Sequence, residues 1–404
     1  MAATIEVDRS FILRDLKIGL FSNPAYSWSF ACDPFCRHFE CHGVSKKVLG
    51  IVIPTKNHAD FVLRQLDYYA VTKCPFTIYI GDSSDQPDSE RITAKVDALN
   101  GHLKIVYQWF DPQIPAQGVT QKLVDMVKEK FVAYSGDDDL FVVEGLQDCC
   151  RFLDQNEDYA TCNGRGVVFG LDRAGAHGQI QILGEYPLKK CELDGAADRL
   201  QQFLSHYWVL DFSVHRTPNF RSSNKCRDVE GPGFLLDASF TELLVGCDAM
   251  LKGKAKQLDR LCLFRQVGAH WSGLSKNTLL EWITQPIFPS SFLIFQDTVT
   301  KALVDRSRLP EELARKLVRN SFNNYLVQSM NLRMHSIPLW SKFKAARRKV
   351  ARSRVARQVY NSLRMIMPGF RRDLRLERLL HRTSPYHRDF MPAYAAITLG
   401  LERK

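Results

Sequence analysis

The chain is predicted to fold as an α/β protein with a mostly parallel sheet flanked by helices. Short apolar runs alternate with amphipathic stretches from Lys47 onward. Consecutive strand–helix–strand units of this kind imply parallel strands with helices on both faces. Several runs end in polar residues, among them the triplet Asp137-Asp138-Asp139. From Lys276 onward the spacing becomes helical, which predicts a C-terminal helical extension.

Four strands and three helices are expected in the first part of the domain. The first apolar run, VLGIVIP, is continuous, as in a strand buried on both faces. Phe61, Val62, Leu66 and Tyr69 then recur at helical spacing. The expected strands are 48–54, 76–80, 104–109 and 131–135, and the expected helices are 59–70, 89–99 and 116–130.

Beyond the Asp triplet the alternation is less regular. Helices are expected at 142–153, 194–206 and 240–251, strands at 159–170, 179–183 and 207–214, and an extended segment at 256–265. Further helices are expected at 279–284, 291–304 and 310–334. We therefore predict an N-terminal extension (1–46), an α/β domain (47–275), a helical subdomain (276–338) and a basic tail (339–404).

The composition is that of a globular protein with an uneven charge distribution. The chain has 404 residues, 45% of them hydrophobic, and a formal net charge of +11. The tail holds about 17 Lys and Arg against about 4 Asp and Glu, so the rest of the chain is close to neutral. Apolar residues at roughly helical spacing opposite the Arg residues favour contact with an anionic membrane surface. Packed helices with solvated Arg faces are the alternative, and nucleic-acid binding is the least favoured.

Cysteine usage and the absence of long apolar runs bear on location. No run of 18 apolar residues occurs, so no spanning helix is expected, and the charged N-terminus has no signal-peptide pattern. Eleven cysteines in mostly apolar contexts favour buried, reduced thiols in a cytoplasmic protein, with peripheral attachment to the membrane as an option. One cluster near the N-terminus comprises Cys32, Cys36, His38, Cys41 and His42. Its residue types suit zinc but its spacing does not, so an irregular segment is expected there.

The ends of three predicted strands are expected to form one crevice. Thr55, Asp82 and the Asp triplet each follow a strand, and the carboxyl ends of parallel strands share an edge where ligands bind. Packed carboxylates repel one another, and a divalent cation shared with substrate phosphates relieves that repulsion. The alternative interpretations are a solvated turn or a helix N-cap for the triplet and an Asx-turn for Asp82.

Four segments carry a family resemblance. They are VLGIVIPTKN, FTIYIGDSSD, FVAYSGDDDLF and FTELLVGCDAMLKGKAKQLDRLCLFRQ. Over about residues 48–270 the chain resembles the family 2 glycosyltransferases, which have a GT-A fold. The resemblance implies metal-dependent, inverting transfer of a sugar from a nucleotide sugar, here a UDP-sugar, to a hydroxyl acceptor. It places Pro54 and Thr55 beside the nucleoside, Asp82 on the base and Lys122 near the nucleotide; a solvated helix residue is the alternative for Lys122.

The Asp triplet matches the DXD motif of that family. The resemblance implies that Asp137 and Asp138 contact the nucleotide and that Asp139, with Asp137, holds Mn²⁺ or Mg²⁺. In the common form of the motif an Asp stands at the position of Gly136. The register of the motif is therefore open by one residue.

The same resemblance assigns the catalytic carboxylate and further ligands. Glu242 falls where family members place the base that takes a proton from the acceptor hydroxyl. Such assistance typically contributes about 10²–10⁴-fold. His270 is a further metal or phosphate ligand in this interpretation, and Arg265 is a phosphate ligand. The alternatives are a helix N-terminal Glu favoured by the dipole for Glu242 and a packed core histidine for His270.

Two other functions remain open at the level of sequence. A nucleotidyltransferase also combines a parallel sheet with metal-binding carboxylates, but the segment after the first strand, TKNHA, lacks the usual glycines. A non-catalytic nucleotide-sugar-binding module would keep the fold without turnover. The acceptor is expected to be a glycan or a lipid-linked acceptor, such as a lipid-linked or a surface polysaccharide. Residues 164–232, which would select it, carry no recognisable motif.

Overall fold

The computed structural model describes residues 48–114, 116–227, 237–267, 279–334 and 373–398. His270, the Cys/His cluster at 32–42 and most of the basic tail lie outside the described residues. The chain divides into two units at Val44/Ser45, and all described residues belong to the second.

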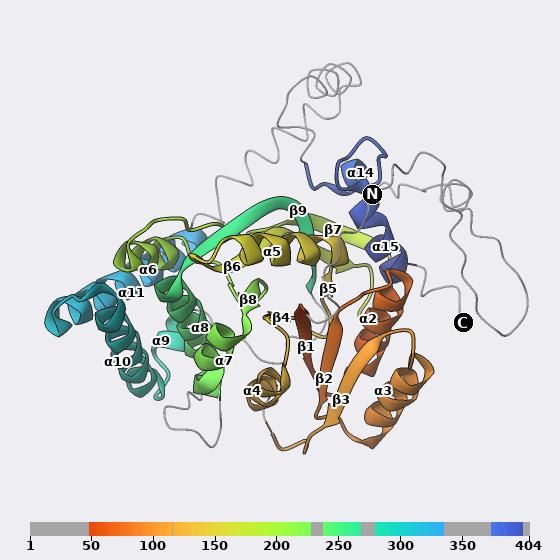
Figure 1. Ribbon diagram of the computed structural model, residues 1–404, viewed down its shortest axis with the longest axis horizontal. Coiled ribbons are helices and arrows are strands. Elements are labelled where there is room, and N and C mark those ends of the chain that lie inside the picture. Colours follow the sequence, from red (N-terminus) through yellow and green to blue (C-terminus); the bar gives the residue numbers. More distant parts are fainter. Residues whose placement is uncertain (1–47, 115, 228–236, 268–278, 335–372, 399–404) are drawn as a thin grey trace, which may run out of the picture. The chain divides into compact units, whose positions relative to one another are not determined.

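Four parallel strands form the first part of a sheet (Figure 1). They are β1 (Leu49–Thr55), β2 (Thr77–Asp82), β3 (Lys104–Trp109) and β4 (Phe131–Tyr134). Their order is β3-β2-β1-β4, so the chain adds two strands on one side of β1 and then crosses to the other. All seven residues of β1 are buried, as the continuous apolar run predicted.

The sheet continues beyond β4 with mixed pairing. The further strands are β5 (Leu140–Phe141), β6 (Tyr159–Leu171), β7 (Ile180–Tyr186), β8 (Val214–Arg216) and β9 (Lys254–Val267). In the described part of the chain the order is β3-β2-β1-β4-β8-β6-β9-β5, with β7 on β6. The β6–β9 pair is parallel, whereas β8 runs antiparallel to β4 and β6.

Helices join and cover the strands. They are α2 (Ala59–Val71), α3 (Gln86–Ala98), α4 (Ala116–Met126), α5 (Val143–Gln155), α6 (Ala196–Ser205), α7 (Thr217–Ser223), α8 (Ala238–Lys252), α9 (Leu279–Ile283), α10 (Phe288–Ser307), α11 (Glu311–Met334), α14 (Leu376–Leu379) and α15 (His387–Thr398). A 3₁₀ turn, Asn224–Arg227, follows α7. Helix α10 packs with α6, α8 and α11, helix α11 also packs with α6, and α15 packs on α2 and β9. The α/β fold with a mostly parallel sheet, flanking helices and C-terminal helices is therefore confirmed.

Two predicted elements differ from the structure. The strand expected at 207–214 is largely irregular, because a turn from the Ser213 amide to the Leu210 carbonyl breaks it, and only Val214–Arg216 pairs as β8. The helix expected to reach residue 130 ends at Met126. Just beyond it, the buried Glu129 carboxylate accepts hydrogen bonds from Thr77 and Tyr79, which draws the chain toward the start of β2.

The described segments contain eight cysteines and helices of several lengths. The eight cysteines in these segments are all buried and free, as expected for reduced thiols. Within the same segments, no helix is both long enough and apolar enough to cross a membrane.

Candidate active site

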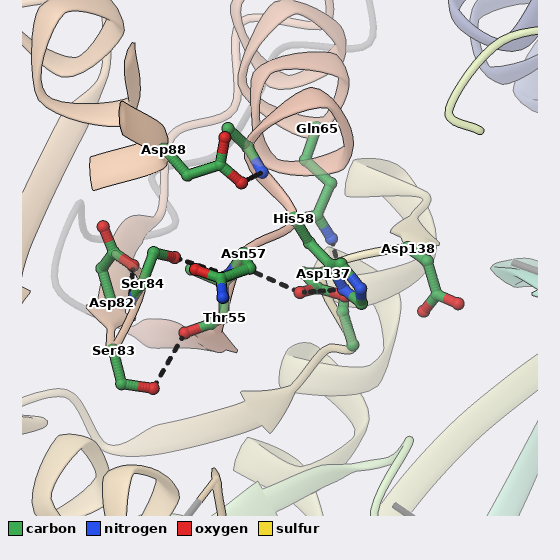
Figure 2. A network of polar contacts seen from close by, with 12 residues as sticks. Thr55, Asn57, His58, Gln65, Asp82, Ser83, Ser84, Asp88, Asp137 and Asp138 are labelled. Carbon is green, nitrogen blue, oxygen red and sulfur yellow. Dashed lines mark hydrogen bonds and ion pairs between the residues drawn. The ribbon is translucent and has the colours of Figure 1, made fainter. Parts of the chain in front are cut away.

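Three predicted strand ends meet at one edge of the sheet. Thr55 lies opposite Asp82 in the β1–β2 register. The Thr55 hydroxyl donates a hydrogen bond of 2.8 Å to Oδ2 of Asp137, which follows β4 (Figure 2). Since the strand order reverses between β1 and β4, this edge is the switch point at which open α/β sheets bind ligands.

The loops after β1 and β2 are fastened to each other. The backbone N–H of Asn57 donates to the Ser84 hydroxyl at 2.7 Å. The Asn57 side chain also donates to the Asp85 carboxylate and accepts from the Asp85 amide, each at 2.8 Å. Asn57 has a φ of 55°, a left-handed conformation that Asn tolerates better than most residues. The edge is thus held in shape by side chains of both loops.

Asp82 is fully buried at this edge. Its Oδ1 accepts from the Ser84 amide and its Oδ2 from the Tyr107 hydroxyl, each at 2.8 Å. The bond from the Ser84 amide to Asp82 forms an Asx-turn, which was the alternative interpretation of Asp82 from the sequence. Tyr107, from β3, was not singled out by the sequence, because its role depends on which strand lies beside β2.

Asp137 is held between β1 and α2. Besides Thr55, the ring Nδ1 of His58 lies 3.1 Å from its Oδ2 (Figure 2). The hydrogen bond to Asp137 raises the pKa of His58, although burial opposes that shift. His58 was missed at the sequence level, and its position directly after IPTKN is the signal that would have found it.

Helix α2 holds the backbone of the segment 135–139, called here the Asp loop. Nε2 of Gln65 donates to the carbonyls of Gly136 and Asp139 at 2.7 and 2.6 Å. Nη2 of Arg64 donates to the carbonyl of Asp138 at 2.6 Å. Both side chains are buried. Sequence reasoning missed them, although two adjacent polar residues among the apolar positions of this helix are a usable signal.

The last two aspartates of the loop lie in an electrostatically unfavourable place. Asp139 is 1% exposed; its Oδ1 accepts from the Gln266 amide at 3.2 Å, and its Oδ2 lies 3.8 Å from Nε of Arg265. Burial and the neighbouring Asp138 raise the pKa of Asp139 well above its usual range. Burial and Asp137 raise the pKa of Asp138 to about 6. A cation placed here would relieve both shifts.

Gly136 lies close to two carboxylates of the Asp loop. A Cβ at this position would lie 2.9 Å from Oδ1 of Asp138 and 3.0 Å from Oδ2 of Asp139. A larger residue would displace those carboxylates.

A second wall of the site surrounds Arg265 on β9. Its Nη1 donates to the Tyr186 hydroxyl at 2.6 Å. Its guanidinium carbon lies 4.4 Å from the centre of the Phe212 ring and 5.1 Å from that of Tyr186. Two aromatic rings and Asp139 therefore hold a permanent cation beside the Asp loop.

Glu242 lies on α8, which packs with α6, α7 and α10. Asp237 caps this helix by accepting from the amides of Ser239 and Phe240. The Tyr207 hydroxyl donates to Oε1 of Glu242. Burial raises the pKa of Tyr186 to about 12, and both Glu242 and Asp139 add to that rise. Arg265 opposes this rise in the pKa of Tyr186.

Pro54 and Lys122, the other described residues predicted to belong to the site, make fewer polar contacts. Pro54 is buried in β1 opposite Gly81. Lys122 is half-buried on α4, and its ammonium group makes no hydrogen bond or ion pair with another described residue. Within the described segments, no group of three His, Cys, Asp or Glu side chains is arranged to hold a metal ion by itself.

Comparisons with known proteins find similarity only among solved structures. No protein-family model matches the chain, and no curated protein sequence matches it. S. aureus TarS 1–349 in complex with UDP-GlcNAc has a TM-score of 0.45 and 13% identity, with 73% of this chain and 77% of that chain covered. A longer TarS structure has a TM-score of 0.44 and 13% identity, and the alignment covers 69% of this chain but only 43% of TarS. The mannosyltransferase PcManGT from Pyrobaculum calidifontis, in complex with GDP-Man and Mn²⁺, has a TM-score of 0.36 and 11% identity over 72% of this chain and 88% of that one.

Proposed function

We propose that the protein is a metal-dependent, inverting glycosyltransferase that transfers a sugar from a UDP-sugar to a hydroxyl acceptor. The observation that carries the proposal is the hydrogen bond between Thr55 and Asp137 at the switch point of the sheet. It joins the end of β1 to the Asp loop directly beside Asp82. Acidic, hydroxyl and cationic groups thus converge where α/β sheets bind nucleotides.

The donor is assigned to this edge. Pro54 and Thr55 would lie beside the nucleoside, Asp82 would accept a hydrogen bond from the base, and Lys122 would lie near the nucleotide. The Asp82 carboxylate already accepts from Ser84 and Tyr107, so a base would bind to a preorganised group and need not order a free side chain. Asp137 and Asp138 would meet the ribose and the phosphates.

The residues present fit a hard divalent cation. Asp137 and Asp139 supply carboxylate oxygens, the ligand type that Mg²⁺ and Mn²⁺ prefer. Burial and the neighbouring aspartates raise the pKa values of Asp138 and Asp139, and a cation beside them would favour their charged forms. Since the described residues hold no complete three-ligand group, the donor's phosphates would complete the coordination. When bound, such an ion stabilises negative charge on the leaving diphosphate.

The other groups have distinct tasks. Glu242 would accept the proton of the acceptor hydroxyl, with Tyr207 holding its carboxylate in place. Arg265 would interact with the diphosphate, and its stacking on Phe212 limits its motion. The acceptor is proposed to be a glycan or a lipid-linked polysaccharide at the cytoplasmic face of a membrane, with the basic tail on that surface.

The test combines calorimetry and turnover. UDP should bind in the presence of Mn²⁺ and much more weakly after chelation, and a panel of nucleotide sugars should reveal one that is hydrolysed or transferred. Glu242→Gln should abolish turnover while UDP binding stays within about twofold. The matched control is Glu312→Gln, an exposed glutamate of α11. The proposal is wrong if no nucleoside diphosphate binds with Mn²⁺, and Glu242 is not the base if its variant turns over normally.

A further inference from the structure

A buried guanidinium lies behind the Asp loop. Arg64 is 1% exposed. Its Nη1 donates to the carbonyl of Ala176 at 2.5 Å and to Oε1 of Gln266 at 2.6 Å, and its Nη2 donates to the carbonyl of Asp138 at 2.6 Å. None of these acceptors is a carboxylate. Burial lowers the pKa of Arg64 to about 10, while the three aspartates of the loop oppose this shift, so the side chain remains charged at neutral pH.

Gln266, one acceptor of Arg64, also contacts the Asp loop and the turn between β6 and β7. Gln266 donates through its backbone amide to Oδ1 of Asp139, and its Nε2 donates to the carbonyl of Gly175 at 2.9 Å. Gly175 and Ala176 belong to the turn 172–178 between β6 and β7. Arg64 therefore joins three segments that are far apart in the chain: α2, the turn and β9.

The turn in its own right contacts the C-terminal helix. The Gly178 amide donates to the carbonyl of Ile397 at 3.2 Å, and Nδ1 of His177 lies 3.1 Å from the carbonyl of Ala396. Helix α15 thus reaches the Asp loop through the turn and Arg64. Residues 387–398, close to the end of the chain, are part of the support of the candidate site.

We propose that Arg64 is a positioning residue that fixes the Asp loop and couples it to α15 through the turn 172–178. A planar guanidinium can serve three acceptors in different directions, whereas the single ammonium of lysine cannot hold the same geometry. Arg64→Lys therefore keeps the charge and removes the bracing. The expected consequence for nucleotide binding rests on the proposed function; the expected consequence for loop order does not.

The experiment compares two buried arginines in the full chain. Arg199 is also buried and donates only to carbonyls, those of Met250, Leu193, Asp194 and Leu251, between α6 and α8. Arg199→Lys is therefore the matched control, because it removes the hydrogen bonds of a buried guanidinium at a place away from the Asp loop. Both variants are measured by thermal unfolding, by hydrogen–deuterium exchange of peptides covering 135–140, and by calorimetry of UDP with Mn²⁺.

Arg64→Lys should speed exchange in 135–140 by about tenfold or more and weaken UDP binding by a similar factor. Arg199→Lys should lower Tm without either effect. Unchanged exchange in Arg64→Lys, or equal changes in both variants, overturns the positioning role. If wild type binds no UDP, the proposed function fails, while the exchange data still decide the role of Arg64. Gln266→Met, which removes one acceptor of Arg64, is the second variant should Arg64→Lys fail to fold, and it should loosen the same peptides.

Discussion

Replacing Asp138 by Asn should stabilise the ligand-free protein at neutral pH. The pKa of Asp138 is raised to about 6, against about 3.9 in an unfolded chain. The folded state therefore holds this proton more tightly than the unfolded state does. Stability falls as pH rises between these two values, and the loss is complete above about pH 7.

The size of the effect follows from the shift. Two pKa units correspond to about 3 kcal/mol, and the partial exposure of the Asp138 side chain reduces this to about 1–2 kcal/mol. Asn has nearly the same shape and carries no charge, so Asp138→Asn should gain that amount at pH 7.5. The gain should shrink as pH falls and vanish below about pH 3, where Asp138 is protonated in both states.

Urea denaturation at pH 4, 5, 6 and 7.5 without metal measures the difference. Asp305→Asn, an exposed position on α10, is the control and should show no such pH dependence. Saturating UDP and Mn²⁺ should then stabilise wild type more than Asp138→Asn, because ligand that binds only the folded state adds stability in proportion to its affinity. A variant that is less stable than wild type at pH 7.5, or a gain that grows as pH falls, would refute the electrostatic reasoning.

Other changes test separate contacts of the site. Gly136→Ala should weaken UDP binding with Mn²⁺ by tenfold or more in calorimetry, because the new methyl displaces the Asp138 and Asp139 carboxylates. Tyr107→Phe should cost about 1.5–3 kcal/mol in urea denaturation, since it removes a hydrogen bond to the buried Asp82 carboxylate. His58→Ala should cost more stability at pH 6 than at pH 8. The pKa of His58 is raised in the folded state, so the stability that this histidine adds is present below about pH 6.5 and is lost as pH rises through the folded pKa. Equal costs in urea denaturation at both pH values would contradict this. Chelation of Mn²⁺ should abolish transfer while Tm without nucleotide changes little.

The sequence predicted much of the fold because its signals are local. Apolar runs and helical spacing located most strands and helices of the described chain to within a few residues. The turn at Ser213 and the short helix α7 were missed, because a few residues carry too little periodicity to distinguish a strand from a loop.

The convergence of Thr55, Asp82 and the Asp triplet also followed from sequence, because residues at the carboxyl ends of parallel strands must share an edge. Whether each carboxylate was exposed or buried did not follow. Asp82 accepts from the Tyr107 side chain and Asp139 from the Gln266 backbone amide, and the sequence could not place either strand beside its aspartate.

By itself, the sequence determined which residues end the strands and therefore which acidic groups meet. Only the tertiary structure decided what holds them: Arg64 bonds to Gln266, which lies 202 positions further along the chain. Local patterns report which face of an element is apolar. They carry no information on which distant polar group meets a buried donor, since that pairing is set by the packing of the whole domain.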